Sequence, residues 1–131
     1  MAERVWLHKR EGDEWGWSAW SLDELGFATW APTRDEVLQR VPGKLAEYRA
    51  WLIGHGETVA SGTNEPNAVD GRGSGAGGVV VVQEIAGNEV AFRDDLVPAT
   101  VAEIQRCARL LDYTRRDLLE AVQSLPDAVL D

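Results

Sequence analysis

Cysteine is scarce in this chain: Cys107 is the only one among 131 residues. A single cysteine cannot form a disulfide within the chain, so the sequence favours a reducing, cytoplasmic setting. No apolar run approaches the roughly 20 residues that a membrane-spanning helix needs. Charged residues also interrupt the N-terminal stretch too often for a signal peptide. We therefore expect a globular cytoplasmic protein without a membrane partner.

Basic residues are also few, because 13 Lys and Arg stand against 22 Asp and Glu, for a formal net charge of −9. A negative field repels phosphate backbones, which disfavours nucleic acid as a partner. The nearest basic cluster lies in the C-terminal helix, and we interpret it as a solvated helix face. It consists of Arg106, Arg109, Arg115 and Arg116.

Patterns that carry chemistry are missing as well. His8 and His55 are far apart and belong to no metal-binding spacing. We interpret Cys107 as a half-buried structural thiol. A two-metal nuclease core would need an aspartate within the first strand, and residues 4–8 contain no carboxylate. We therefore expect no catalytic residue, no metal site and no cofactor.

Three short strands are predicted at the N-terminus, over residues 4–9, 15–20 and 26–30. A helix over residues 34–53 should follow, because Thr33 and Glu36 have the spacing of a capping box. Its apolar stripe is Leu38, Val41, Leu45, Tyr48 and Leu52.

Two residues of this predicted helix have a special role. Pro42 removes one backbone hydrogen bond, so we predict a kink or break near residues 39–42. Gly54 is expected to end the helix as its C′ residue.

All six tryptophans lie before residue 52. Strict alternation along the strands puts Trp15 and Trp17 on one sheet face and Trp20, with Trp6 or Trp30, on the other. One helix can cover only one face of a sheet. The other face should meet the C-terminal helix or a second copy of the chain, or leave two or three indole rings exposed.

The middle of the chain is predicted to complete the sheet. Residues 61–78 are rich in glycine and favour a flexible loop. The four valines at 79–82 predict a strand buried on both faces, with an apolar edge strand as the alternative. Gly87-Asn88 then indicates a hairpin turn with a return strand over residues 89–92.

A long C-terminal helix is predicted over residues 100–124, with Thr100 and Glu103 as a second capping box. Apolar residues follow one another at steps of three, four and seven, as in the a/d seam of a coiled coil. Arg115 occupies one seam position, and the seam needs a partner surface. The apolar seam is Val101, Ile104, Ala108, Leu111, Leu118, Val122 and Leu125.

Three motifs between Trp15 and Gly56 resemble the HicB-like antitoxin domain, which more loosely spans residues 4–92. They are the turn Leu22-Asp23-Glu24-Leu25-Gly26, the helix start Thr33-Arg34-Asp35-Glu36 and the helix end Tyr48-Arg49-Ala50-Trp51-Leu52. Leu25 and Phe27 stand where the family has proline and cysteine. The resemblance implies a degenerate ribonuclease-H-like domain that binds a HicA-like toxin. The DNA-binding module that usually follows is not recognisable.

Residues 98–131 are similar to the opening of the DinB-like four-helix bundle. The family's three metal-binding histidines would lie on later helices, so the resemblance implies a relic, a truncated segment or a helix put to another use. The matching residues are Thr100, Glu103, Ile104, Arg109, Leu110, Leu111, Tyr113, Arg116, Asp117, Leu118, Leu119, Leu125, Pro126 and Asp127.

We therefore expect an α+β protein with a small antiparallel sheet packed on the helix at 34–53 and a long C-terminal helix. Its parts would be a HicB-like unit (1–60), a glycine-rich loop (61–78), a strand or hairpin (79–97) and a helical segment (98–131). The expected function is non-enzymatic protein interaction, with the chain itself as a homodimer partner and a HicA-like toxin as another. The alternative is an accessory part of a DinB-like metal-dependent enzyme. The expected interaction surface is Trp15, Trp17, Trp20, Trp30, Ile104, Ala108, Leu111, Leu118 and Val122.

Overall fold

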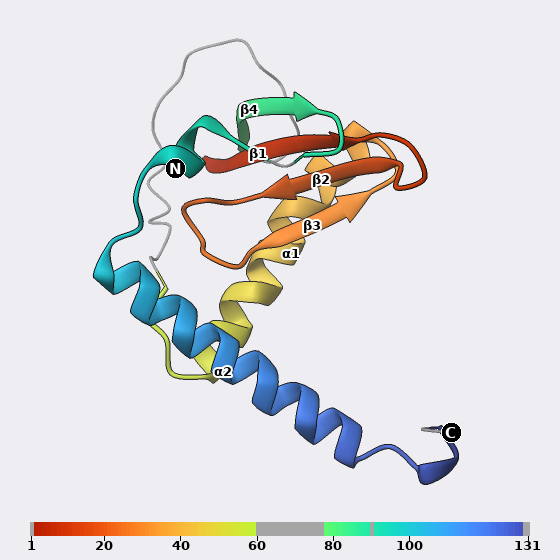
Figure 1. Cartoon of the computed structure of the whole chain (residues 1–131), viewed down its shortest axis with the longest axis vertical. Coiled ribbons are helices and arrows are strands. Elements are labelled where there is room, and N and C mark those ends of the chain that lie inside the picture. The colour runs from red at the N-terminus through yellow and green to blue at the C-terminus, as the bar shows by residue number, and fades with distance from the viewer. Residues whose placement is uncertain (1, 60–77, 90, 130–131) are drawn as a thin grey trace. The chain divides into compact units, whose positions relative to one another are not determined.

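The computed structural model describes residues 2–59, 78–89 and 91–129, which fall into two compact units, Met1–Val97 and Pro98–Asp131 (Figure 1). Four strands and two α-helices among these residues confirm the α+β class. The first unit contains β1 (Glu3–Arg10), β2 (Gly16–Trp20), β3 (Ala28–Ala31), α1 (Arg34–Gly54), β4 (Val79–Ala86) and the 3-10 turn η1 (Arg93–Leu96). The second contains α2 (Val101–Gln123) and the 3-10 turn η2 (Asp127–Val129).

The sheet has the strand order β3-β2-β1-β4. The first three strands are antiparallel, and Gly12 takes the positive φ of 77° that the turn between β1 and β2 requires. β4 pairs with β1 in parallel, so the predicted antiparallel sheet is in fact mixed. A parallel neighbour needs a crossover connection, and the chain segment that contains α1 provides it.

The four-valine strand lies at an edge of this sheet, which corrects the predicted burial on both faces. Val79 and Val81 pack against the core, whereas the side chain of Val80 points away from it and is 50% exposed. The pairing of β1 with β4 shifts in register between Val5 and Trp6. After this shift, the side chains of β4 alternate between the two sheet faces in the opposite order. The apolar edge strand is therefore the correct interpretation.

The return strand predicted over 89–92 is wrong: Glu89, Ala91 and Phe92 lie outside any strand, and residue 90 is outside the described part of the chain. Gly87 ends β4 with a positive φ of 123° and donates its N–H to the Lys9 carbonyl (3.1 Å). The chain then leads to η1, where Phe92 is buried. The predicted loop over 61–78 lies, except for Gly78, outside the described residues.

The core lies between α1 and one face of the sheet. Its centre is fully buried and consists of Val5, Leu7, Ala19, Ala31, Val37 and Val41. Alternation explains the sheet contribution, because Val5 and Leu7 of β1 point the same way. The predicted α1 stripe is confirmed: Val41, Leu45 and Leu52 are buried, and Leu38 and Tyr48 are half-buried. Each buried aliphatic side chain stabilises the unit by about 1.5–3 kcal/mol.

The ends of α1 follow local rules. The capping box is confirmed, since the Glu36 backbone N–H donates to Thr33 Oγ1 (3.3 Å) and the Thr33 N–H donates to Glu36 Oε2 (3.2 Å). Of the kink or break predicted near residues 39–42, the break is absent, because α1 continues through Pro42 without interruption to Gly54. Gly54 was expected at the C′ position, but the left-handed residue after the helix is Gly56 (φ 84°).

α2 is an uninterrupted helix of 23 residues. Its predicted capping box is also confirmed: the Thr100 N–H donates to Glu103 Oε2 (2.6 Å), and the Glu103 N–H donates to Thr100 Oγ1 (3.2 Å). The hydrogen bond from the Thr100 backbone N–H to the carboxylate, helped by the Thr100 side chain, lowers the pKa of Glu103 from its ordinary value. A negative charge in this first turn also suits the positive end of the helix dipole.

Candidate interaction surfaces

The sheet face opposite α1 carries Trp6, which is buried and contacts two other residues of the first unit. Trp6 is 1% exposed, and its Nε1–H donates to Asp94 Oδ2 in η1 (2.7 Å). The Arg4 guanidinium lies 5.1 Å from the centre of the indole ring, at the distance of a cation–π contact. Trp6 is therefore a structural residue of the first unit and is not available to a partner.

Trp15 and Trp30 form an exposed aromatic pair, with 60% and 38% of their surfaces open to solvent. Their ring centroids are 5.7 Å apart in an edge-to-face arrangement, and Trp30 Nε1–H donates to the Trp15 carbonyl (3.3 Å). Gly16 makes this possible, because a Cβ there would lie 2.5 Å from Trp30 Nε1. These two residues are the exposed part of the predicted tryptophan surface.

The face assignment of Trp15 was wrong. Alternation put Trp15 beside Trp17, but Trp17 packs against the core and Trp15 contacts Trp30. Trp15 precedes β2, and Gly16 has a φ of 108°, so the period-two rule does not extend to Trp15. Trp20 is half-buried, and its Nε1–H is enclosed without a hydrogen-bond partner among the described residues.

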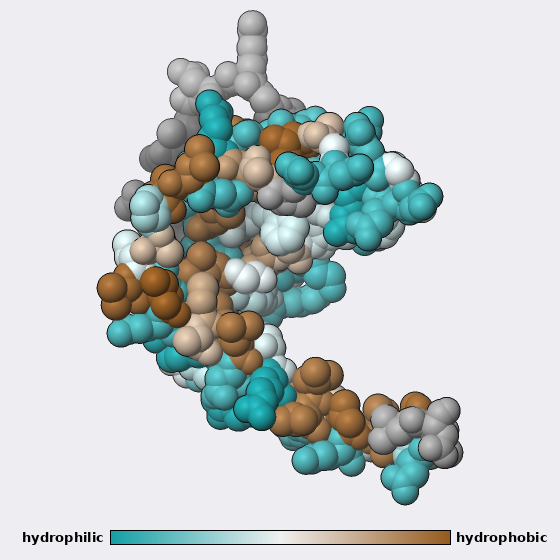
Figure 2. Space-filling view, viewed as in Figure 1, coloured by the Kyte–Doolittle hydropathy of each residue, from teal (hydrophilic) through white to brown (hydrophobic). Residues whose placement is uncertain are grey.

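The second candidate surface is the apolar seam of α2. Its large side chains are between 39% exposed, at Val122, and 71% exposed, at Leu111. In the space-filling view, apolar side chains gather along this helix (Figure 2). The seam as it stands in the structure is Val101, Ile104, Ala108, Leu111, Leu118, Val122 and Leu125, all exposed.

Two other residues of α2 differ in burial. Leu110, which lies outside the seam, is 7% exposed. Cys107 was expected to be half-buried, but it is an exposed free thiol. Its position next to the seam explains the difference, because the seam beside it is open to solvent in this structure. The cysteine therefore provides no packing in the α2 helix as described.

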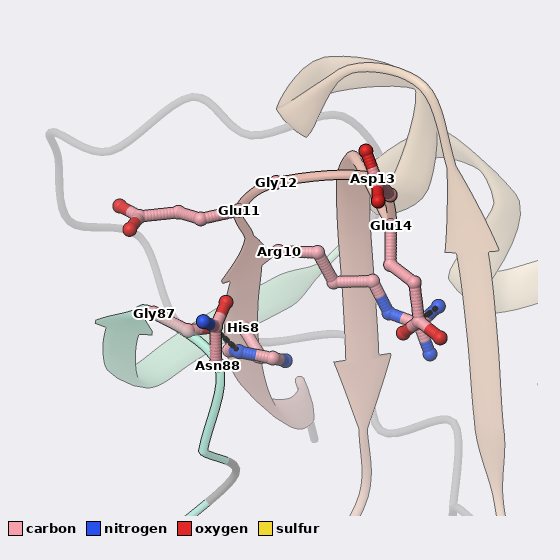
Figure 3. A pocket seen from close by; sticks show the side chains of 8 residues that line it. All are labelled: His8, Arg10, Glu11, Gly12, Asp13, Glu14, Gly87 and Asn88. Carbon is pink, nitrogen blue, oxygen red and sulfur yellow. Dashed lines mark hydrogen bonds and ion pairs between the residues drawn. The ribbon is translucent and has the colours of Figure 1, made fainter.

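A hollow that the sequence did not predict lies at one end of the sheet (Figure 3). Its volume is about 480 Å³, and the parallel pairing of β1 with β4 brings its two loops together. The hollow is lined by His8, Arg10, Glu11, Gly12, Asp13, Glu14, Gly87 and Asn88. No local sequence pattern could reveal it, since its loops are more than 70 residues apart in the sequence.

His8 is the buried residue of this hollow, at 3% exposure. Its Nε2 lies 2.7 Å from the Gly87 carbonyl, so this ring nitrogen carries a proton and donates it. Its Nδ1 is buried without a hydrogen-bond partner among the described residues. Beside it, Arg10 and Glu14 form a solvent-exposed ion pair (3.6 Å). Within the described residues, no three His, Cys, Asp or Glu side chains are placed to hold a metal ion.

One polar network inside the first unit was also missed by sequence reasoning. Arg49 of α1 donates to both carboxylate oxygens of Glu3 (2.7 and 3.0 Å) and to Glu24 Oε1 (2.9 Å). The hydrogen bond to Glu3, helped by Glu24, raises the pKa of Arg49, although burial acts in the opposite direction. This network ties α1 to β1 and to the turn before β3, and its role is structural.

Comparisons of the chain with protein-family models, with curated proteins and with solved structures found no match. Among the helices of the described residues, none combines the length and the apolar character that crossing a membrane requires.

Proposed function

We propose that this chain is a non-enzymatic protein-interaction module of the HicB-like antitoxin type, which works in the cytoplasm. The observation that carries the proposal is the exposed apolar seam of α2. A lone amphipathic helix gains little stability in water without a surface that covers its apolar stripe. A contiguous exposed apolar patch is also a marker of a protein-binding site.

The architecture of the first unit supports the same proposal. Three antiparallel strands, a helix and a further strand fit the residue span over which the HicB-like motifs were found. The middle of β1 carries Val5, Trp6 and Leu7, which are buried apolar residues where a two-metal nuclease would need a carboxylate. The proposed role is therefore binding rather than RNA cleavage.

The charge distribution suggests what the module binds. Acidic and basic residues balance within α2, four of each, whereas the whole chain has a formal net charge of −9. The excess negative charge therefore lies outside α2. Such a field would accelerate association with a basic ribonuclease of the HicA-like type. We propose this toxin class and a second copy of the chain as the partners.

A binding experiment on the full chain tests the proposal. The wild type, Leu118→Asp in the seam and Ala102→Asp outside it are mixed with a purified HicA-like toxin and sized by light scattering. Circular dichroism confirms that each variant keeps its helices. We expect complexes larger than one chain for the wild type and Ala102→Asp, and at least tenfold weaker association for Leu118→Asp.

Two results would contradict the proposal. One is a wild type that associates neither with itself nor with the toxin. The other is a Leu118→Asp variant that binds as tightly as the wild type. Calorimetric titration with Zn²⁺ addresses the DinB-like alternative, because stoichiometric binding of the metal would favour it.

A further inference from the structure

We infer that the seam of α2 is covered by α2 of a second copy of the chain, which runs antiparallel and is centred on Tyr113. This inference rests on the proposed function and specifies the partner of the same surface. Three properties of α2 carry it: the period of the seam, the match between its two halves, and the charge of the helix.

The period of the seam is that of a coiled coil. Its eight positions, with Arg115 included, alternate steps of three and four from Val101 to Leu125. A helix that packs on a globular core carries a wider stripe, as α1 does, where Val37, Leu38 and Val41 all face the core. The seam of α2 is the narrow two-per-heptad stripe that one other helix can cover, and Leu110 and Leu119 are large apolar residues of α2 outside it. At 1.5 Å per residue the helical part of the seam, from Val101 to Val122, is about 32 Å long.

The two halves of the seam match when one copy is reversed. In an antiparallel pair centred on Tyr113, every a position of one helix lies opposite a d position of the other. Small Ala108 then lies opposite large Leu118, as close packing requires. Three layers, each formed twice, lie within the helices: Ile104 with Val122, Ala108 with Leu118, and Leu111 with Arg115. At each end, Val101 lies opposite Leu125, which follows the end of α2.

Arg115 explains why the antiparallel direction is favoured over the parallel one. In a parallel pair, the two Arg115 side chains would face each other in one layer, where like charges repel and lose hydration. The antiparallel alignment sets each Arg115 against Leu111 and separates the two arginines by four residues, about 6 Å along the axis. The long arginine side chain can then lie along the apolar layer and keep its charge in water.

Charge also permits this pairing. Within Val101–Gln123, four acidic residues balance four basic ones, so two α2 helices approach without net repulsion. Antiparallel helices also bring the positive end of one helix dipole near the negative end of the other. In this pair the seam side chains would lose contact with water. The polar residues Gln105, Asp112 and Thr114 flank the seam and would stay in water at the edge of the helix–helix interface.

Disulfide trapping in the full chain tests the inference. Cys107 is first replaced by alanine, and this background receives Ala108→Cys, Leu118→Cys or both. In the antiparallel pair, positions 108 and 118 of different copies share a layer. Equal positions lie ten residues, about 15 Å, apart, which is beyond the reach of a disulfide. The same spacing prevents a bond between positions 108 and 118 of one chain.

We expect the double variant to form a covalent dimer under mild oxidation at least ten times faster than either single variant. If Leu118→Cys alone crosslinks equally fast, the pair is parallel and the inference is overturned. If no variant crosslinks and the wild type has the mass of one chain, the seam has another partner. A complex with the toxin would in that case leave the proposed function intact and remove only this inference.

Discussion

The first unit of the chain buries a core of apolar residues, whereas the second exposes most of its apolar residues. In the first unit, α1 and the sheet enclose a core of valine, leucine and alanine, and Val5, Leu7 and Val41 are inaccessible to solvent. In the second unit, α2 exposes most of its large apolar residues. The first unit therefore contains within one chain the contacts that stabilise it, whereas the apolar seam of α2 is open to solvent.

Because of this difference, the stability of the first unit and the association of α2 can be measured separately. The stability of the first unit should not depend on protein concentration, because its core is formed within one chain. A helix stabilised by association becomes more stable as the partner concentration rises.

The largest effect is expected from leucine truncation in the two units. Leu45 is 2% exposed, so Leu45→Ala should lower the free energy of unfolding of the first unit by about 2–5 kcal/mol. Leu111 is 71% exposed, so Leu111→Ala should leave that transition unchanged and weaken association instead. Urea unfolding followed by tryptophan emission measures the first unit, which holds all six tryptophans. Equal losses in both variants would contradict the contrast.

A smaller effect is expected from the buried ion network. Arg49→Met leaves Glu3 and Glu24 without their shared donor, and Glu24 is 6% exposed. We expect a loss of about 2–3 kcal/mol, since breaking a partly buried pair strands its partner charges. Lys44→Met is the matched control, because Lys44 and Glu47 form an exposed pair that contributes about 0.5 kcal/mol or less. Urea unfolding measures both variants. A similar loss of unfolding free energy in both would show that the Arg49 network contributes no more than an exposed ion pair.

Glycine substitution tests whether Gly16 makes room for the Trp30 ring of the exposed tryptophan pair. Gly12 and Gly16 both have positive φ angles, but only at Gly16 would a new Cβ meet Trp30, at 2.5 Å. We expect Gly12→Ala to cost about 1 kcal/mol from backbone strain, and Gly16→Ala to cost about 1 kcal/mol more. Thermal unfolding measures both. Equal shifts would mean that Trp30 moves aside without cost.

The smallest effect is a pH dependence of α2. The pKa of Glu103 is lowered by its hydrogen bonds to Thr100, so the ionised form stabilises the helix. This contribution is complete above the ordinary pKa of 4.5 and is lost as the pH falls through the lower pKa of the folded state. Far-ultraviolet circular dichroism from about pH 6 to about pH 3 should show less helix for Glu103→Gln than for wild type at the upper end. A difference that persists unchanged at the lower end would contradict this.

Local features of the fold could be predicted well from the sequence. The capping boxes at Thr33 and Thr100 depend on residues three apart, and both are present in the structure. The stripe of α1 and the extent of α2 follow from helical periodicity. The predictions that were wrong concern features that depend on residues far away in the sequence. The direction of β4, for example, is set by its pairing with β1, which no short window contains.

Among the candidate surfaces, too, those set by local spacing could be predicted and those set by long-range contacts could not. Helical spacing alone named the residues of the α2 seam, and these residues are exposed, all of them on α2 except Leu125, which follows its end. Strand alternation placed Trp15 on the wrong face, because the positive φ of Gly16 interrupts the alternation just after Trp15. Gly16 lies against the Trp30 ring, a contact between residues far apart in the sequence that no local pattern reveals. The hollow around His8 could not be predicted, since it joins the β1–β2 turn to Gly87 and Asn88.

Sedimentation equilibrium of the full chain, wild type against Leu118→Asp, tests the pairing of α2 with its own copy most directly. We expect a wild-type mass of two chains at tens of micromolar and a mass of one chain for the variant. A wild type with the mass of one chain, whose α2 amides are nevertheless protected from hydrogen exchange, would rule out this pairing. In that case the seam would be covered within its own chain.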